Sequence, residues 1–549
     1  MKNAVVITDA PKVNYMHNFV VLPYYYGTAK YFDRPDVKAI RETLYTSLDT
    51  LDEATGFADK FRGRKVLIKP NLVGVVHKSG YRLDDVPQST DPRVLEAAVS
   101  YLKSLDCEIT IVEGAGKGIS TMQYFRDTGL DRVAKYYGCN LAAVEEQPLD
   151  HYYVPKAEVQ KDVYLPRIFS EVVRGEALFV SVPKMKTNLY TGVTLGFKNA
   201  MGALSGNMRY RNHTWQIEKK LVDLLYLLKP DLTVVDGIVG GEGNTPAPVD
   251  PVKVGMVVTG TNTVEVDRVV TKIMGLDPEK LSLMKEANLR GFGDPDAEII
   301  GDIRVVPFRP AQSSFLTPRF RRIWPNVRYF VGHTNSRAPQ ITDIHTVTPE
   351  LVYEIEGACR GGCLATMSFF MEMLYQGKST YDPSLKFAVI LGNGCEVDGE
   401  RYWFDADGKA YSLEALKNVA VKRVLGCGSC TEPAFGACTL CGGDCGNVGG
   451  VLQLFMKGTR KTLPILSISN DTMGSFIAGM LLKYFAVRKV IKSGDIVEIP
   501  FDATNDRIFP IPDLSEEDKL KDWIFVPMEK CSRRQIKMNL KSYQMIQIG

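Results

Sequence analysis

Short apolar runs alternate with amphipathic segments along the first 300 residues of this 549-residue chain. We expect buried strands in five of the apolar runs, at residues 66–68, 109–112, 178–182, 233–235 and 254–258. Helical spacing of apolar residues predicts helices at 91–105, 217–228 and 264–274, the first of them begun by Asp91 and Pro92. Strands that alternate with helices predict an α/β fold, with an open, mainly parallel or mixed sheet covered by helices on both faces.

The alternation breaks between residues 310 and 350, where LTPRFRRIWPNVRYF is basic, aromatic and rich in turn residues. A second α/β part then follows, with the predicted elements being strands at 387–391, 421–425 and 463–468, a helix at 475–485 and an exposed strand at 492–500. We predict three segments: an α/β anion- or substrate-binding domain at 1–310, a linker or excursion at 311–350, and the second part, with a cysteine-rich loop at 426–450, at 351–549. The linker arginines are typical of a solvated face, with docking of an acidic partner as the alternative.

Composition and charge exclude several classes of protein. A net charge of +3 over so long a chain gives no basic field for nucleic acid. No run of about 18 apolar residues is present, and the best candidate, at 473–487, is short and contains Lys483. The N-terminus MKNAVVITDAPKV does not have the pattern of a secretory signal. We therefore expect a cytoplasmic protein without a membrane span, in which a disulfide framework is disfavoured.

Five of the eleven cysteines lie in GCGSCTEPAFGACTLCGGDCGNVGG, spaced Cys427-x2-Cys430-x7-Cys438-x2-Cys441-x3-Cys445. Two C-x-x-C pairs supply four thiolates, enough for one cubane iron–sulfur cluster or one zinc ion. Structural zinc usually joins such pairs across about 15 to 20 residues, so the short loop favours a 4Fe-4S cluster. Zinc is the alternative metal, and redox disulfides are the third interpretation.

Four of the five cysteines are our first choice of ligands: Cys427, Cys430, Cys438 and Cys441. Cys445 could replace one of them. Three further cysteines beside glycines, Cys359, Cys363 and Cys395, could form a second centre or an active-site thiol. An equally good interpretation is that these three are small buried residues next to turns.

Polar donors are concentrated in PKMKTNLYTGVTLGFKNAMGALSG, directly after the predicted strand at 178–182. Cationic and neutral donors together suit a carboxylate or phosphate, and ligands of open α/β sheets lie beyond the carboxyl ends of strands. The alternative is a polar loop with solvated lysines. Other strand ends add Lys69-Pro70-Asn71, Glu113, Asp236 and the Glu242–Asn244 stretch. The predicted substrate-binding residues are Lys69, Asn71, Lys184, Asn188, Thr191, Lys198, Asn199, Glu242 and Asn244.

Four residues are candidates for catalysis. Lys186 shares one face with Lys184 if the chain is extended, and Glu113 and Asp236 are acidic groups that could handle protons. Histidine ordinarily titrates near neutrality, so His213 is a candidate acid or base, although a lone histidine is more often structural.

Six motifs occur in order along the chain: KVLIKPNLV, STDPRVLEAAVSYL, VEGAG, VSVPKMKTNLYTGVTLGFKNAMG, VVDGIVGGEGNTP and VEVDRVVTKIMG. This series resembles the family called domain of unknown function 362, over residues 60–300, with a looser similarity from 380 onward. The resemblance implies an α/β domain in an anaerobic or redox setting, because members often carry iron–sulfur clusters in a ferredoxin-type insert or tail. The ferredoxin repeat C-x2-C-x2-C-x3-C-P is missing, and the cysteine segment at 427–445 stands in its place.

The leading hypothesis is an iron–sulfur oxidoreductase that acts on a small anionic substrate and exchanges electrons with a redox partner protein. The alternative is a non-catalytic cluster carrier, or a maturation factor for another metalloenzyme. A third hypothesis is a ligase or isomerase whose cluster is structural or a Lewis acid. The sequence leaves a second cluster, a flavin and a homo-oligomer open.

Overall fold

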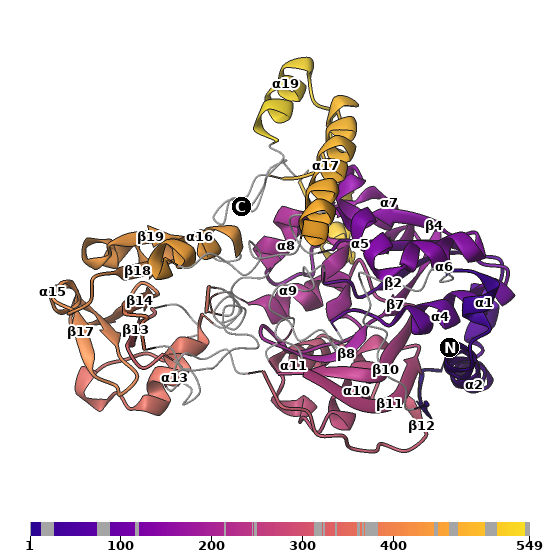
Figure 1. Cartoon of the computed structure of the whole chain (residues 1–549), viewed down its shortest axis with the longest axis horizontal. Coiled ribbons are helices and arrows are strands. Elements are labelled where there is room, and N and C mark those ends of the chain that lie inside the picture. Colours follow the sequence, from indigo (N-terminus) through magenta and orange to yellow (C-terminus); the bar gives the residue numbers. More distant parts are fainter. Residues whose placement is uncertain are drawn as a thin grey trace.

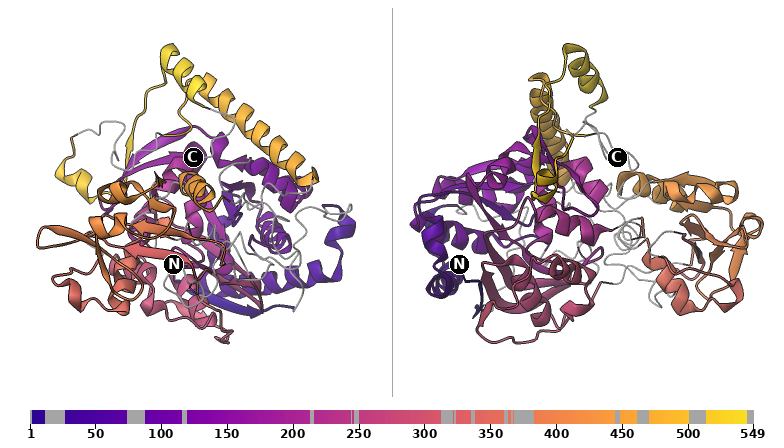
Figure 2. Two further views of the ribbon diagram at one scale, coloured as in Figure 1. Left: turned by 60° about the vertical axis from the view of Figure 1, so that its left-hand side comes forward. Right: turned by 180° about the vertical axis from the view of Figure 1, so that it is seen from behind.

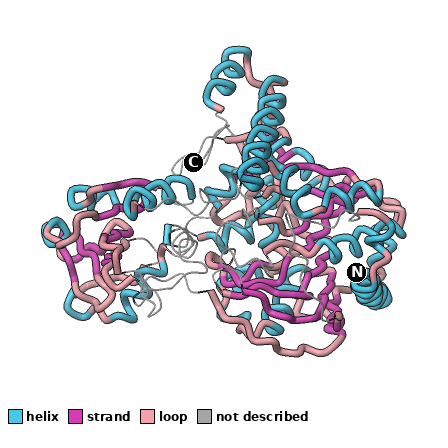
Figure 3. Tube along the Cα trace, in the orientation of Figure 1, coloured by secondary structure: helices cyan, strands magenta, loops and turns pink. Residues whose placement is uncertain are grey.

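The computed structural model describes residues 2–11, 27–73, 88–115, 120–212, 216–243, 245, 250–311, 321, 324–334, 338–359, 363–364, 367, 383–443, 448–460, 470–499 and 513–543. Two large sheets with flanking helices account for most of them (Figures 1 and 3). A three-stranded sheet and a long helix near the C-terminal end are the next largest elements.

The first sheet has ten strands and a mixed direction. Along its main path the order is β12 (Glu298–Ile300), β1 (Ala4–Asp9), β11 (Asp250–Gly260), β10 (Leu232–Glu242), β7 (Ala177–Val182), β2 (Lys65–Pro70), β3 (Glu108–Glu113) and β4 (Asn140–Ala143). Strands β10, β7, β2, β3 and β4 run parallel, whereas β11 is antiparallel to both β1 and β10. Two short strands branch from β10, namely β8 (Lys184–Asn188) and β9 (Gly192–Thr194).

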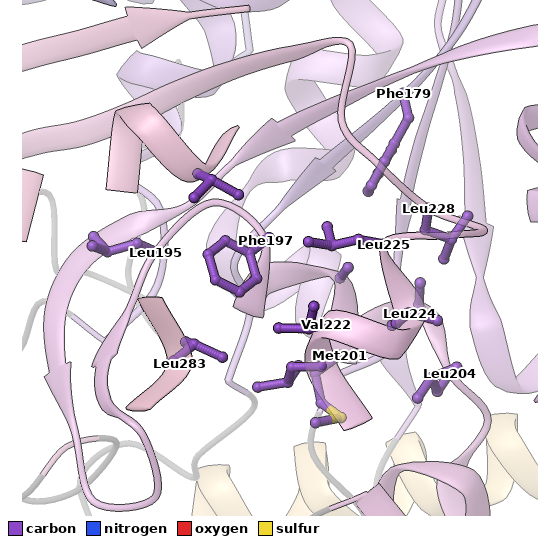
Figure 4. Close-up of a cluster of buried hydrophobic side chains, with 14 of the residues drawn as sticks. Phe179, Leu195, Phe197, Met201, Leu204, Val222, Leu224, Leu225, Leu228 and Leu283 are labelled. Atoms are coloured by element: carbon purple, nitrogen blue, oxygen red, sulfur yellow. The ribbon is translucent and has the colours of Figure 1, made fainter. Parts of the chain in front are cut away.

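Both faces of this sheet are buried. Leu67 packs into one apolar cluster, while its neighbours Val66 and Ile68 pack into another, as the alternation of side chains along a strand requires. The cluster with Val66 contains the apolar residues of α2 (Pro35–Thr55), α3 (Phe57–Phe61), α4 (Pro92–Ser104), α5 (Thr121–Thr128) and α6 (Leu130–Tyr137). The other cluster, drawn in Figure 4, includes residues of α7 (Arg167–Val173), η2 (Lys198–Ala203), α8 (Gly206–Asn212), α9 (Ile217–Leu224), α10 (Thr263–Ile273) and α11 (Ser282–Leu289). The predicted α/β sheet with helices on both faces is confirmed.

The second sheet has seven strands and lies to one side of the first in Figure 1. Its order is β15 (Cys395–Val397), β16 (Glu400–Phe404), β13 (Val327–Val331), β14 (Phe387–Leu391), β18 (Val424–Cys427) and β19 (Leu440–Gly442), with β17 (Ala410–Ser412) paired to β16. The neighbours β13, β14, β18 and β19 are parallel. The helical elements of this part are η4 (Ile344–Thr346), α13 (Pro349–Gly357), α15 (Leu413–Lys417), η5 (Ser429–Ala437) and α16 (Val448–Thr459).

The C-terminal elements return to the first part of the chain. Strand β20 (Ile524–Val526) pairs with β5 (Leu149–Tyr153), which pairs with β6 (Asp162–Pro166). Helix α17 (Asn470–Lys492) packs against α5 and η1 (Val144–Glu146), along one side of the first part in Figure 2. The remaining elements are α1 (Ala29–Phe32), η3 (Pro278–Lys280), α18 (Glu516–Leu520) and α19 (Arg533–Ser542).

Several sequence predictions differ from these bounds. Residues 311–350 are not simply a linker, because β13 lies within them and is a central strand of the second sheet. The segment at 492–500 is not an exposed strand: α17 extends to Lys492, and Val497 and Ile499 beyond it are buried. Helix α17 and strand β20 contact the first part, although the sequence places them in the second. The predicted strand at 463–468 lies outside the described residues.

Candidate functional site

Four lysines gather where the central strands of the first sheet end. Strand β2 runs beside β7 with Lys69 opposite Ser181, and β8 runs beside β10 with Lys184 opposite Asp236. Carboxyl ends of parallel strands meet at one edge of a sheet, which is where open α/β sheets bind ligands. The lysine cluster, defined here as Lys69, Lys184, Lys186 and Lys198, is buried at this edge.

Lys184 is neutralised by a carboxylate. Its ammonium donates to Asp236 at 2.9 Å, and both side chains are fully buried. The same Asp236 oxygen accepts the backbone N–H of Asp91 at 2.7 Å. Burial raises the pKa of Asp236, and the positive charge of Lys184 opposes that rise. Asp91 also caps α4 by accepting the N–H of Arg93, as the sequence predicts, so the cap and the ion pair are coupled.

Lys69 forms the second internal ion pair, with Glu113 at the end of β3. Burial lowers the pKa of Lys69 and raises that of Glu113, while the attraction between the two charges opposes both shifts. Asn199 supports this pair, because its Oδ1 accepts from Lys69 at 3.2 Å and its Nδ2 donates to the Lys69 carbonyl at 3.0 Å. Lys69, Glu113 and Asn199 are therefore brought together as predicted.

Lys186 has only neutral acceptors among the residues that the structure describes. Its ammonium donates to Asn71 Oδ1 at 2.6 Å and to the carbonyl of Gln88 at 2.5 Å. Complete burial lowers the pKa of Lys186 well below its ordinary value, and the nearby positive charges of Lys198 and Lys184 lower it further. A proton on this amine is consequently easier to lose than on a surface lysine.

Lys198 stands at the start of η2 with 7% of its surface exposed. Within the described part of the chain, no hydrogen bond or ion pair involves its ammonium group. Burial lowers the pKa of Lys198 to about 8, and the charge of Lys69 adds to this effect. Of the four lysines, two are thus paired with carboxylates and two are not, so the described cluster carries an excess of positive charge.

Asp267 holds the loop that carries Lys198. Its carboxylate, on α10, accepts the backbone N–H groups of Gly196 at 2.6 Å and Phe197 at 3.3 Å. Burial raises the pKa of Asp267 to about 8. Asp267 is not among the site residues that the sequence predicts. The available signal was a carboxylate in register with Val264 and Val270 on the apolar stripe of a predicted helix.

Some predicted site residues are engaged elsewhere. Asn188 Oδ1 accepts the N–H groups of Tyr190 and Thr191 and contacts the Thr191 hydroxyl at 3.2 Å, so both side chains stabilise the turn between β8 and β9. Glu242 accepts the backbone N–H of Arg309 at 2.7 Å. Two other predicted residues, His213 and Asn244, lie outside the described residues.

Four cysteines of the second sheet lie two by two beside two glycines at the end of β18. A β-carbon added at Gly426 would lie 2.8 Å from Cys438 Sγ and 3.4 Å from Cys441 Sγ. One added at Gly428 would lie 3.2 Å from Cys363 Sγ and 3.4 Å from Cys430 Sγ. The two pairs therefore occupy space left open by two glycines at the end of β18. Cys445 lies outside the described residues.

A histidine accompanies the remaining thiols. His333, just after β13, has its Nε2 2.7 Å from Cys359 Sγ, and Cys395 Sγ lies 3.5 Å from the His333 carbonyl oxygen. Burial lowers the pKa of His333 to about 4, so the imidazole is neutral. None of the described cysteines is in a disulfide.

The donor chemistry of these residues fits an iron–sulfur cluster, because thiols are its ordinary ligands. Among the described residues, however, no group of three or more His, Cys, Asp or Glu side chains is gathered as a metal site. The described thiols thus supply pairs of donors, which suit iron–sulfur clusters and zinc alike.

The part of the chain that carries the lysine cluster matches a known protein family. Residues 66–272 match the family described as Domain of unknown function (DUF362). The resemblance inferred from the six sequence motifs is confirmed over these residues. The chain is also 25% identical, over 274 residues, to the thylakoid-associated protein sll1697 of Synechocystis sp., covering 47% of this chain and 78% of that protein. No solved structure matches.

The segment that matches DUF362 contains all four lysines, both of their carboxylate partners and Asp267. Cys359 and every cysteine after it lie beyond that segment. The match to the family model therefore covers the lysine cluster and does not extend to the thiols from Cys359 onward. In the described part of the chain, no helix is both long enough and apolar enough to cross a membrane.

Proposed function

We propose that this chain is a cytoplasmic iron–sulfur oxidoreductase that acts on a small anionic substrate, a carboxylate or phosphate, bound by the lysine cluster. The observation that carries the proposal is the burial of Lys186 and Lys198 without a carboxylate partner in the described residues. Buried charges are otherwise paired, because an unpaired ammonium in an apolar setting is costly.

A bound anion would compensate that cost directly. Its oxygens would accept from Lys198, which has no described acceptor, and share Lys186 with Asn71 and the Gln88 carbonyl. Charge-assisted hydrogen bonds of this kind are about twice as strong as neutral ones. The favourable interaction would raise the pKa of both lysines back toward the ordinary range.

Proton transfer would use groups that already have shifted pKa values. Lys186 can give up a proton readily, and the Lys69–Glu113 pair holds a proton between two buried partners. We assign Lys186 and Glu113 as the candidate acid and base. Asp236 forms an ion pair with Lys184 and ties it to the start of α4. When bound, an iron–sulfur cluster would supply single electrons to the substrate.

Isothermal titration with inorganic phosphate and with succinate tests the anion site. We expect binding of at least one probe by the wild-type chain and a loss of at least tenfold in affinity for Lys198→Met. Lys60→Met is the matched control, because Lys60 pairs with Asp231, which precedes β10 at the opposite edge of the sheet. Equal binding by wild type and Lys198→Met would contradict the assignment of the site.

Anaerobic purification tests the redox part of the proposal. We expect about four iron and four sulfide per cluster, and an electron paramagnetic resonance signal after reduction. Lys198→Met should leave that signal unchanged, because the lysines and the thiols belong to different sheets. A colourless chain with one zinc and no sulfide would remove the oxidoreductase proposal and leave anion binding standing.

A cluster carrier or maturation factor is the second candidate function, and the exposure of Cys441 favours it. A ligand at the surface is accessible to a protein that accepts the cluster. Transfer of iron and sulfide to an apo-ferredoxin, without reduction of any anionic substrate, would favour the carrier over the oxidoreductase.

A further inference from the structure

Strand β8 fixes the direction of two lysines of the cluster. Met185 packs into the apolar cluster on one face of the first sheet, and a β-carbon added at Gly237 would lie 2.7 Å from its Cε. Successive residues of a strand point to opposite sides, so Lys184 and Lys186 both point away from Met185. The amine of Lys186 is therefore positioned by regular backbone, which holds a functional group more precisely than a loop does.

The hydrogen bonds of Asn199 determine which end of the Asn71 amide faces Lys186. Asn199 Nδ2 donates to the Lys69 carbonyl at 3.0 Å and to Ser181 Oγ at 3.1 Å, which leaves Asn199 Oδ1 as an acceptor. Asn71 Nδ2 donates to that oxygen at 3.3 Å. An amide carries its donor and its acceptor on different atoms, so Asn71 presents its Oδ1 to Lys186.

The number of acceptors distinguishes Lys186 from Lys69. The Lys69 ammonium has three described acceptors, one for each proton, namely Glu113, Asn199 Oδ1 and the Pro70 carbonyl. Lys186 has two described acceptors, and both are neutral. Two acceptors are what the two N–H groups of a neutral amine require, and among the described residues no donor then faces its lone pair. The lowered pKa of Lys186, caused mainly by burial, agrees with this count.

A neutral lysine amine attacks carbonyl carbons, and proteins activate it by removing water or by placing a second cation nearby. Lys186 meets both conditions. Only 1% of its surface is exposed, and the positive charges of Lys198 and Lys184 act on its amine. Lys184 is paired with Asp236, whereas Lys198 has no described acceptor. The site thus combines a nucleophilic amine with a neighbouring cation that can hold an anionic group.

We propose that Lys186 forms an imine with the carbonyl carbon of a 2-oxo acid whose carboxylate is held by Lys198. The amine nitrogen bonds to the carbonyl carbon, the C–O bond breaks, and the two amine protons leave with the oxygen as water. No electrons pass to or from the protein, and water reverses the step. The inference rests on the proposed function for the anion site and not for the iron–sulfur cluster. It names the anion as one in which a carbonyl adjoins the carboxylate.

Reductive trapping tests the imine on the wild-type chain, so the result does not depend on the folding of a variant. Pyruvate and sodium cyanoborohydride are added at pH 7, and the reagent delivers hydride to the imine carbon while a solvent proton goes to the nitrogen. Peptide mass mapping then shows which lysines have gained a carboxyethyl group. We expect labelling of Lys186 to exceed that of Lys60 by at least about tenfold, because an ordinary surface lysine is almost entirely protonated at pH 7.

Methyl pyruvate tests the role of the carboxylate, because this ester keeps the carbonyl and lacks the negative charge. The ratio of pyruvate to methyl pyruvate labelling at Lys186 should be at least about ten times the ratio at Lys60, since a hydrogen bond to a charged group contributes about 1.5–3 kcal/mol. In Lys198→Met, the ratio at Lys186 should fall to the ratio at Lys60. Any change in the protonation of Lys186 affects both probes equally and cancels in this ratio.

The results separate this inference from the proposed function. If the chain binds phosphate or succinate in the titration but pyruvate does not label Lys186, the imine is overturned and the anion site stands. If Lys186 is labelled but Lys198→Met leaves the ratio unchanged, the assignment of the carboxylate to Lys198 is overturned. A chain that binds neither anion and is not labelled at Lys186 removes the anion site and the imine together.

Discussion

Replacing Lys198 by methionine should stabilise the chain in the absence of an anion. Methionine has a similar length and no charge, and among the described residues no hydrogen bond of Lys198 would be lost. Burial lowers the pKa of Lys198 from 10.5 to about 8. At about 1.4 kcal/mol per pH unit, this shift corresponds to roughly 3 kcal/mol of unfavourable free energy for the protonated amine in the folded chain.

The sign of the pH dependence follows from proton linkage. Between pH 8 and 10.5 the unfolded chain binds more protons at this residue than the folded chain does, so wild-type stability rises with pH across that window. Below pH 8 the full penalty applies. We expect Lys198→Met to exceed the wild type by up to about 3 kcal/mol at pH 7, and the difference to disappear near pH 10.5.

Urea unfolding of both proteins at pH 7, 8.5 and 10, without phosphate, measures this difference, and other titrating groups cancel in the comparison. Lys60→Met should change stability by no more than about 1 kcal/mol, because a half-exposed ion pair contributes little. A Lys198→Met chain that is less stable than wild type at pH 7, or a difference that does not vary with pH, would refute the reasoning.

Three further variants test the supports of the two sites. The stability that Asp267→Asn gains over wild type, measured by urea unfolding, should grow from pH 4 to pH 8. The reason is that the wild-type carboxyl, with its pKa raised to about 8 by burial, keeps its proton across this range only in the folded state. A gain that is independent of pH would contradict this. Phe197→Ala should cost about 3–5 kcal/mol of unfolding free energy, since the ring is fully buried in the cluster of Figure 4, and an unchanged denaturation midpoint would argue against the packing shown there. Gly426→Ala would place a β-carbon 2.8 Å from Cys438 Sγ, so we expect a loss of about 1–3 kcal/mol of unfolding free energy. The rate of Cys438 alkylation, followed by mass spectrometry, should change as well. Gly436→Ala is the control and should change neither quantity, because only the end of the Lys417 side chain lies within 4 Å of its added β-carbon.

The elements that the sequence predicts well are those whose own periodicity decides their structure. Helix α4 begins at Asp91 and Pro92 as expected, because the cap and the fixed proline conformation act locally. The lysine cluster was also predictable, since one contiguous segment after β7 supplies Lys184, Lys186 and Lys198, and the edge of a parallel sheet collects whatever follows its strands.

Long-range contacts account for most of what the sequence does not show. Strand β13 was not predicted because it lies in an arginine-rich stretch. It belongs to a sheet through its pairing with β14 on one side and β16 on the other. Cys363 reaches Gly428, at the end of β18, through the parallel strands that lie between them in the chain, and no local spacing records that approach. Asn188 shows the opposite case, because a short polar side chain can bind its own turn as readily as a ligand.

Anion binding should take up protons near pH 8. At that pH about half of the Lys198 side chains are neutral in the unliganded chain, and a bound anion would raise the pKa of the amine and return the proton. Phosphate or succinate binding should therefore take up about half a proton at pH 8 and about a tenth at pH 7, and affinity should fall as the pH rises above 8. Titration calorimetry in two buffers with different ionisation enthalpies measures this uptake. Lys198→Met should abolish the Lys198 share, leaving only what Lys186 contributes, so an uptake that is unchanged in this variant would place the anion away from Lys198.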